Sequence, residues 1–186
     1  MAEDKMSGEL LTTRLLFLGM GMFVLFASCS PAPGKGILEI RVKDHRAAID
    51  DFAQLNVPVE SIRLKPRGKW IDLKPDPVGL DLTHYKEGNS VTLFQGEIES
   101  GSFEGFHLNL GKIGGILKKG NARVELKSGV GPIQLSFSVE PNKPTLLIID
   151  LEVLDLTDHM GRGYELHING YEHFMNGKLI DRVPPG

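Results

Sequence analysis

A two-residue alternation of apolar and polar side chains is the feature that most constrains the fold of this chain. In "ILEIRVK" (residues 37–43), Leu38, Ile40 and Val42 alternate with charged side chains. Because successive side chains of a β-strand point to opposite faces, this pattern predicts a strand with one face in a core and one in water. The same alternation recurs in "FHLNL" (106–110), "ARVELK" (122–127), "IQLSFSVE" (133–140) and "YELHIN" (164–169). Such strands are typical of antiparallel sheets.

The apolar segment "LLIIDLEVLDL" (146–156) predicts a long central strand. It has the length of a helix, but Ile148, Ile149 and Val153 are β-branched, which favours a strand. Stretches rich in Gly, Pro, Asn and Asp separate the strand segments at short intervals. The chain is therefore predicted to fold as an all-β, antiparallel β-sandwich.

Residues 45–66 contain two departures from a simple alternation. The segment "HRAAIDDFAQL" (45–55) is the helical candidate, and it predicts one short helix or helical turn. In "NVPVESIRLKP" (56–66) the apolar phase changes between Val59 and Ile62, so a regular strand would turn its hydrophobic face to water midway. A β-bulge near Glu60 or Ser61 would keep both halves facing the core.

The single cysteine, Cys29, closely follows an uncharged apolar run, "LLFLGMGMFVLFA" (15–27). As a helix this run would span roughly 20 Å, which is short for the ~30 Å hydrocarbon core of a membrane. Such a run, preceded by Arg14 and followed by small residues, is typical of an export signal. The segment "FASC" (26–29) resembles the lipobox of bacterial lipoproteins, in which the cysteine is acylated and becomes the first mature residue. An uncleaved membrane anchor and a signal cut elsewhere are the alternatives.

These features divide the chain into a signal peptide with its helix (1–28), the acylated Cys29 with a Pro/Gly tether (29–35) and a β-sandwich domain (36–186). A multiply acylated cysteine holds a protein firmly on a membrane. The predicted location is therefore outside the cytoplasm, lipid-anchored to the cell envelope at the outer membrane or the outer face of the plasma membrane. The formal net charge of -3 gives no electrostatic basis for binding nucleic acid.

Three segments resemble, in order and spacing, the exported bacterial and archaeal domain of unknown function 4382: residues 36–66, 69–75 and 79–110. The positions that carry the resemblance are Gly36, Asp44, Trp70, Asp81, Leu82, Gly101, Phe103 and Leu108. The resemblance implies an immunoglobulin-like or transthyretin-like β-sandwich, often placed behind a lipobox. It implies no established activity and no catalytic residues.

Four residues are candidates for ligand binding. Trp70, the only tryptophan, lies opposite Ile71 on its strand, so it either packs under a loop or forms an aromatic platform for a sugar or a protein. Asp44, Asp50 and Asp51 surround one connection and could supply oxygens to a ligand or to Ca²⁺, although turn and helix-capping roles are commoner for such aspartates.

Catalytic and metal-binding motifs are absent from the sequence. The six histidines show no zinc-site spacing, and no nucleophile or phosphate-loop motif is present. We therefore predict no catalytic residue, no metal site and no cofactor apart from a covalent lipid on Cys29, with Ca²⁺ as a minor alternative.

The sequence thus predicts a membrane-anchored cell-envelope lipoprotein that acts as a non-catalytic binding or assembly module. Its expected partners are the membrane, through the lipid, and either a surface glycan or an envelope protein complex. A carbohydrate-binding module and an accessory subunit of such a complex are both compatible with the sequence. A hydrolase is the least supported class.

Overall fold

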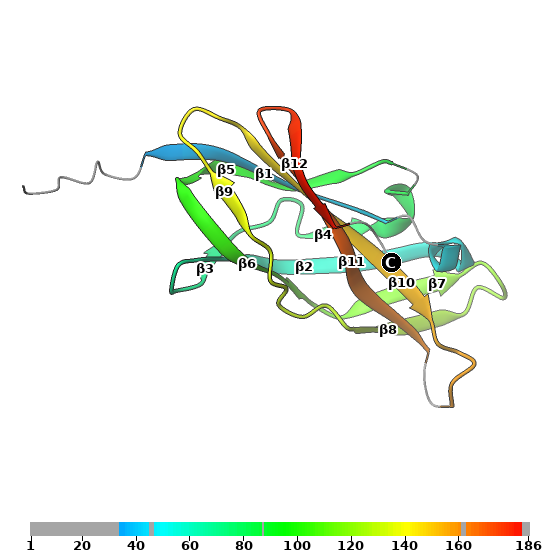
Figure 1. The fold of residues 1–186 in the computed structure, drawn as a ribbon. Helices are drawn as coiled ribbons and strands as arrows, with labels where there is room; N and C mark the ends of the chain where they lie inside the picture. Colours follow the sequence, from blue (N-terminus) through cyan, green and yellow to red (C-terminus); the bar gives the residue numbers. More distant parts are fainter. Residues whose placement is uncertain (1–33, 45–46, 87, 161–162, 184–186) are drawn as a thin grey trace, which may run out of the picture. The chain divides into compact units, whose positions relative to one another are not determined.

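The computed structural model describes residues 34–44, 47–86, 88–160 and 163–183. The predicted signal helix, Cys29 and the predicted tether up to residue 33 lie outside the described residues. The strands are β1 (Lys35–Asp44), β2 (Phe52–Pro66), β3 (Ile71–Leu73), β4 (Gly79–Asp81), β5 (Val91–Glu99), β6 (Gly101–Leu110), β7 (Ile113–Leu117), β8 (Arg123–Ser128), β9 (Phe137–Val139), β10 (Thr145–Asp155), β11 (Tyr164–Met175) and β12 (Lys178–Val183) (Figure 1). Two short 3-10 helices are η1 (Ala47–Asp51) and η2 (Leu82–His84).

The strands form one hydrogen-bonded sheet in the order β5-β1-β10-β11-β8-β7-β2-β6-β9. In addition, β12 pairs with β11, and β3 and β4 pair with β2. Most pairings are antiparallel, as predicted, but β1 runs parallel to β10 and a short part of β8 runs parallel to β11. The alternation of side chains within a strand does not specify which strands pair with it or in which direction. The two parallel pairings could therefore not be predicted from the sequence pattern.

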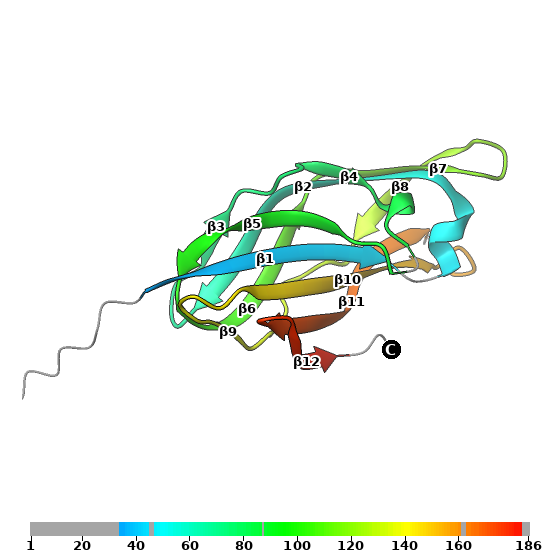
Figure 2. The ribbon, with the colours of Figure 1, turned by 90° about the horizontal axis from the view of Figure 1, so that it is seen from above.

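The sheet folds back into two layers around a single core. One layer holds β5, β1, β10 and β11, and the other holds β7, β2, β6 and β9. Figure 2 shows β1 and β10 lying across β2 and β6. A single cluster of buried side chains joins the layers, with Leu38 and Ile149 from the first and Ile62 and Phe106 from the second all fully buried. The prediction of an all-β sandwich is therefore confirmed.

β10 is the central strand of its layer, as its apolar sequence predicted. It lies between β1 and β11, and its alternate side chains Leu147, Ile149, Leu151 and Val153 are buried. These four residues alternate without a break in phase. β10 therefore supplies a continuous hydrophobic stripe against which the second layer packs.

β2 contains the bulge that its change of apolar phase predicted. The pairing with β6 skips Glu60, so Val59 and Ser61 pair with adjacent residues of that strand. As a result Val59 and Ile62, which differ in phase, are both buried. The extra residue restores the contact between both halves of β2 and the core.

The helical segment after β1 is shorter than the sequence pattern predicted. A 3-10 turn, η1, is present, but it ends at Asp51, and β2 begins at Phe52. Residues 52–55 of the predicted helix therefore belong to a strand. The ring of Phe52 is buried and packs edge-on against Tyr164 of β11, with ring centroids 4.8 Å apart. Residues 52–55 have the apolar spacing of a helix, but the contact of Phe52 with the opposite layer favours a strand.

Two consecutive glycines in β7 differ in what surrounds them. A Cβ atom at Gly115 would lie 2.6 Å from the buried ring of Phe52, so the core requires a glycine at this position. A Cβ atom at Gly114 would meet no atom within 4 Å. Packing therefore explains one glycine of the pair and not the other.

We expect Gly115→Val to lower the free energy of unfolding by about 1–3 kcal/mol, because overpacking forces the Phe52 ring to move. Gly114→Val is the matched control, and it should leave stability unchanged or higher, since glycine weakens a strand. Urea denaturation of both variants measures the difference. Equal losses in the two variants would contradict the packing described for β7.

Candidate functional site

Trp70 lies on the outer face of the second layer, just before β3. β3 pairs with β2, and β2 in turn pairs with β6. The indole reaches toward β6, where a Cβ atom at Gly105 would lie 3.1 Å from its Cη2 atom. The side chain is half-buried. Gly105 thus leaves the space in which the indole lies, an arrangement in which an aromatic ring covers a strand glycine.

Two cations beside Trp70, Arg63 and Lys65, each have a carboxylate partner. The Arg63 guanidinium lies 5.3 Å from the centre of the indole and 3.1 Å from an oxygen of Asp72. Lys65 lies 3.2 Å from Glu104 on the neighbouring strand. Because these two cations are paired, they add no net positive charge beside the indole that would select a polyanion.

The half-buried indole lines a hollow of about 550 Å³, which we call the Trp70 hollow. Its other walls are Lys65, Glu104, Gly105, Pro132, Ile133, Gln134 and Ser136. The volume lies within the range of about 300–1,000 Å³ that small-ligand sites occupy. An aromatic ring, an amide, a hydroxyl and an ion pair thus meet in one place.

A β-bulge shapes this hollow. The pairing of β6 with β2 is regular from Asn109 to Gly105 and then skips Glu104, so that Phe103 pairs with Pro66. Phe103 is buried, whereas Glu104 is exposed. The bulge therefore turns Glu104 outward beside Gly105, and both line the hollow.

A second hollow, the His173 hollow, has a volume of about 430 Å³ and lies between β6 and β9 on one side and β11 and β12 on the other. His173 is only 2% exposed, and its Nε2 atom has no hydrogen-bond partner among the residues that the structure describes. The ring lies 5.9 Å from that of Phe137, which stacks on Phe103. The remaining walls are Arg67, Ser102, Glu104, Ser136, Ser138, Ile180 and Asp181.

Burial lowers the pKa of His173, although the carboxylate of Asp181 acts in the opposite direction. The imidazole is therefore neutral at neutral pH. Asp181 itself accepts a hydrogen bond of 2.8 Å from the hydroxyl of Tyr171. Burial and this hydrogen bond raise the pKa of Tyr171 to about 12, so the phenol keeps its proton and holds β12 against β11.

The structure does not bring the three candidate aspartates together. Asp44 is fully buried at the end of β1, on the face that points into the core. Asp50 accepts a hydrogen bond from Lys86, and this hydrogen bond and the charge of Lys86 lower the pKa of Asp50. Asp51 accepts a hydrogen bond of 3.0 Å from the hydroxyl of Tyr164. Within the described residues, these three carboxylates do not form a cluster that could hold Ca²⁺.

Two features are absent from the described residues. Among residues 34–44, 47–86, 88–160 and 163–183, no three His, Cys, Asp or Glu side chains are placed to hold a metal ion. In the same part of the chain, no helix has the length and apolar character needed to cross a membrane.

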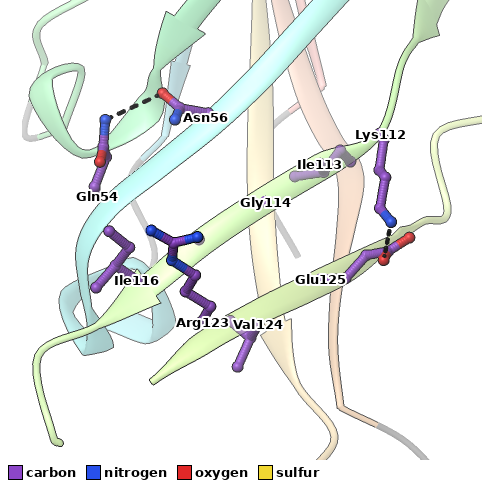
Figure 3. A pocket seen from close by; sticks show the side chains of 10 residues that line it. Gln54, Asn56, Lys112, Ile113, Gly114, Ile116, Arg123, Val124 and Glu125 are labelled. Atoms are coloured by element: carbon purple, nitrogen blue, oxygen red, sulfur yellow. Dashed lines mark hydrogen bonds and ion pairs between the residues drawn. The ribbon is translucent and has the colours of Figure 1, made fainter. Parts of the chain in front are cut away.

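A third hollow, of about 730 Å³, lies on the outer face of β2, β7 and β8 (Figure 3). Gly114 leaves its floor open, and Gln54, Asn56 and Arg123 surround it. Lys112 and Glu125 form an ion pair of 2.7 Å at its rim. No aromatic side chain lines this Gly114 hollow.

Trp70 was predicted as a candidate from the sequence, but the residues that complete its surroundings were not. Glu104, Ser136 and His173 carry no motif of their own. A signal for His173 was nevertheless present, because the inward residues of β11 change phase from Ile168 to Tyr171. The pairing with β10 skips Asn169 at this point, which turns His173 toward the core.

The fold defines the class of this protein as an all-β sandwich built from one mixed sheet. Within that class, the chain belongs to the family described as a domain of unknown function, DUF4382, which matches residues 35–166. The match includes the Trp70 hollow and ends before His173 and β12. Searches of curated proteins and of solved structures returned no match.

We expect the free energy of unfolding to fall as the pH decreases below about 6.5, the ordinary pKa of histidine. Burial lowers the pKa of His173 in the folded chain, so the unfolded chain binds more protons over this range. Burial and the nearby Arg63 lower the pKa of His107, which contributes in the same direction.

His173→Phe should remove part of this pH dependence in urea denaturation at several pH values. His159→Phe, at an exposed position, is the control and should keep it. A profile that is unchanged in His173→Phe would mean that the buried imidazole takes up a proton as freely as it does in the unfolded chain.

Proposed function

We propose that this protein is a lipid-anchored cell-envelope protein whose β-sandwich binds a ligand and performs no chemistry of its own. Two independent parts of the chain support the proposal. The amino-terminal sequence supports the anchor, and the Trp70 hollow supports the binding surface.

The anchor rests on the sequence around Cys29. The cysteine follows an apolar run and stands at the end of "FASC", and β1 begins only six residues later, at Lys35. The intervening Pro and Gly residues favour an extended linker without a hydrophobic face. A lipid on Cys29 would therefore hold the domain close to a membrane surface.

Cys29→Ala should release the protein from the membrane fraction and abolish labelling by radioactive fatty acid, since several acyl chains are needed for stable attachment. Fractionation and labelling of wild-type and variant cells measure both effects. Retention of the unlabelled variant in the membrane would instead favour the uncleaved anchor.

The ligand that the site fits best is a carbohydrate or surface polymer of the envelope. The observation that carries this proposal is the half-buried Trp70, which lines a hollow together with Gln134, Ser136 and the paired Lys65 and Glu104. Aromatic rings contact the apolar faces of sugars, and amide and hydroxyl groups bind their hydroxyls. The balanced charges favour a neutral polymer.

Trp70→Ala should weaken binding of neutral oligosaccharides at least about tenfold by calorimetry, because it removes the aromatic contact. Arg123→Ala, in the Gly114 hollow, is the control and should bind like wild type. Since Trp70 is the only tryptophan, binding should also change the intrinsic fluorescence of the wild-type chain. Loss of binding in Arg123→Ala alone would move the site to the Gly114 hollow.

An accessory subunit of an envelope protein complex is the second candidate function. β12 pairs with β11 along one side, and its side chains Leu179, Ile180 and Val183 are 45%, 53% and 46% exposed. Exposed apolar side chains on an edge strand are a common basis for association with another protein. A chain that binds no oligosaccharide but co-purifies with a defined envelope protein would favour this function.

A further inference from the structure

The Trp70 hollow and the His173 hollow share two of their walls. Glu104 and Ser136 line both, and no other residue does. Glu104 is the bulged residue of β6, and Ser136 directly precedes β9. The two hollows are therefore neighbours, with Trp70 in one and His173 in the other.

The buried Nε2 atom of His173 is a polar group for which the described part of the chain provides no hydrogen-bond partner. A buried polar atom without a hydrogen bond costs free energy, so most such atoms in folded proteins are paired. Here the imidazole lines a hollow large enough for a ligand group. A ligand that supplies the missing partner would recover this cost on binding.

A hydroxyl group suits this position better than an ion does. The nitrogen of a neutral imidazole either donates or accepts, depending on the tautomer, and a hydroxyl can do both. Ser102, Ser136 and Ser138 add further hydroxyls to the walls, while Phe137 presents an apolar ring. These groups match a ligand with many hydroxyls on an apolar frame.

The charges along both hollows are balanced. Lys65 is paired with Glu104, and Arg67 and Asp181 add one charge of each sign. The surface therefore has no excess charge that would attract an anionic polymer.

We propose that the two hollows are subsites of one groove that binds an extended, neutral glycan chain, with a sugar hydroxyl bonded to the buried Nε2 atom of His173. This inference rests on the glycan-binding function proposed for the Trp70 hollow, and it adds chain length as a determinant of affinity. Short oligosaccharides occupy the Trp70 hollow alone. Longer ones pass Glu104 and Ser136 and reach His173.

The test is calorimetric titration of the full chain, purified in a detergent without sugar groups, with neutral β-linked glucose oligomers of increasing length. Wild type should bind longer oligomers more tightly than the disaccharide. His173→Phe should bind the longer oligomers about two- to tenfold more weakly, because it removes one hydrogen bond. Its affinity for the disaccharide should be unchanged. His159→Phe is the control and should bind all lengths like wild type.

A second measurement needs no variant. In wild-type chain labelled with ¹⁵N-histidine, the Nε2 resonance of His173 should shift when a longer oligomer is added and stay in place when the disaccharide is added. This reading remains available if His173→Phe fails to fold.

Three results would overturn the inference. If His173→Phe retains the gain with length, or if the Nε2 resonance does not respond, the groove does not extend to His173, while a loss of binding in Trp70→Ala would still support the proposed function. If wild type gains nothing with length, the two hollows are separate. If wild type binds no oligomer, the glycan-binding function fails, and this inference fails with it.

Discussion

The requirement that every long strand keep one face against a single core determines this structure. β10 meets it with an unbroken alternation, but β2, β6 and β11 each change apolar phase along their length. A bulge in each of them, at Glu60, Glu104 and Asn169, restores the contact with the core. Two of the three bulges also shape the candidate site, because one turns Glu104 outward beside Trp70 and the other turns His173 inward. The surface that we propose for binding is thus a consequence of how the core is kept continuous.

The sequence predicted those parts of the fold that depend on local periodicity. The central place of β10 and the bulge at Glu60 follow from the alternation of side chains, and both are confirmed. Most of the predicted strands are also present, but of the predicted strand 133–140 only Phe137–Val139 form one, β9. The parallel pairing of β1 with β10 depends on contacts across the whole chain, which alternation does not encode. The end of the helical turn at Asp51 was also missed, since residues 52–55 have helical spacing and Phe52 is held in a strand by packing across the core.

The candidate site was also only partly predictable, because it depends on contacts between residues that are distant in the sequence. Trp70 is conspicuous because it is the only tryptophan, but whether it is buried depends on Gly105, which lies far from it in sequence. The positions that carry the family resemblance mostly build the fold: Asp81 accepts hydrogen bonds from Leu55 and Thr83, and Phe103 stacks on Phe137 in the core. Burial alone would raise the pKa of Asp81, but these hydrogen bonds lower it. The family therefore defines a scaffold, and the proposed ligand surface has to be argued from its own geometry.

The central claim is that the face around Trp70, and not the open face around Gly114, binds an envelope glycan. The most direct test is two-dimensional ¹H–¹⁵N NMR of the ¹⁵N-labelled full chain in detergent without sugar groups, titrated with a neutral oligosaccharide. The account predicts that the indole N–H of Trp70, the backbone N–H of Gly105 and the side-chain amide of Gln134 shift together, while Gly114 and Asn56 do not. Shifts confined to Gly114, Asn56 and Arg123, or no shifts at all, would contradict it.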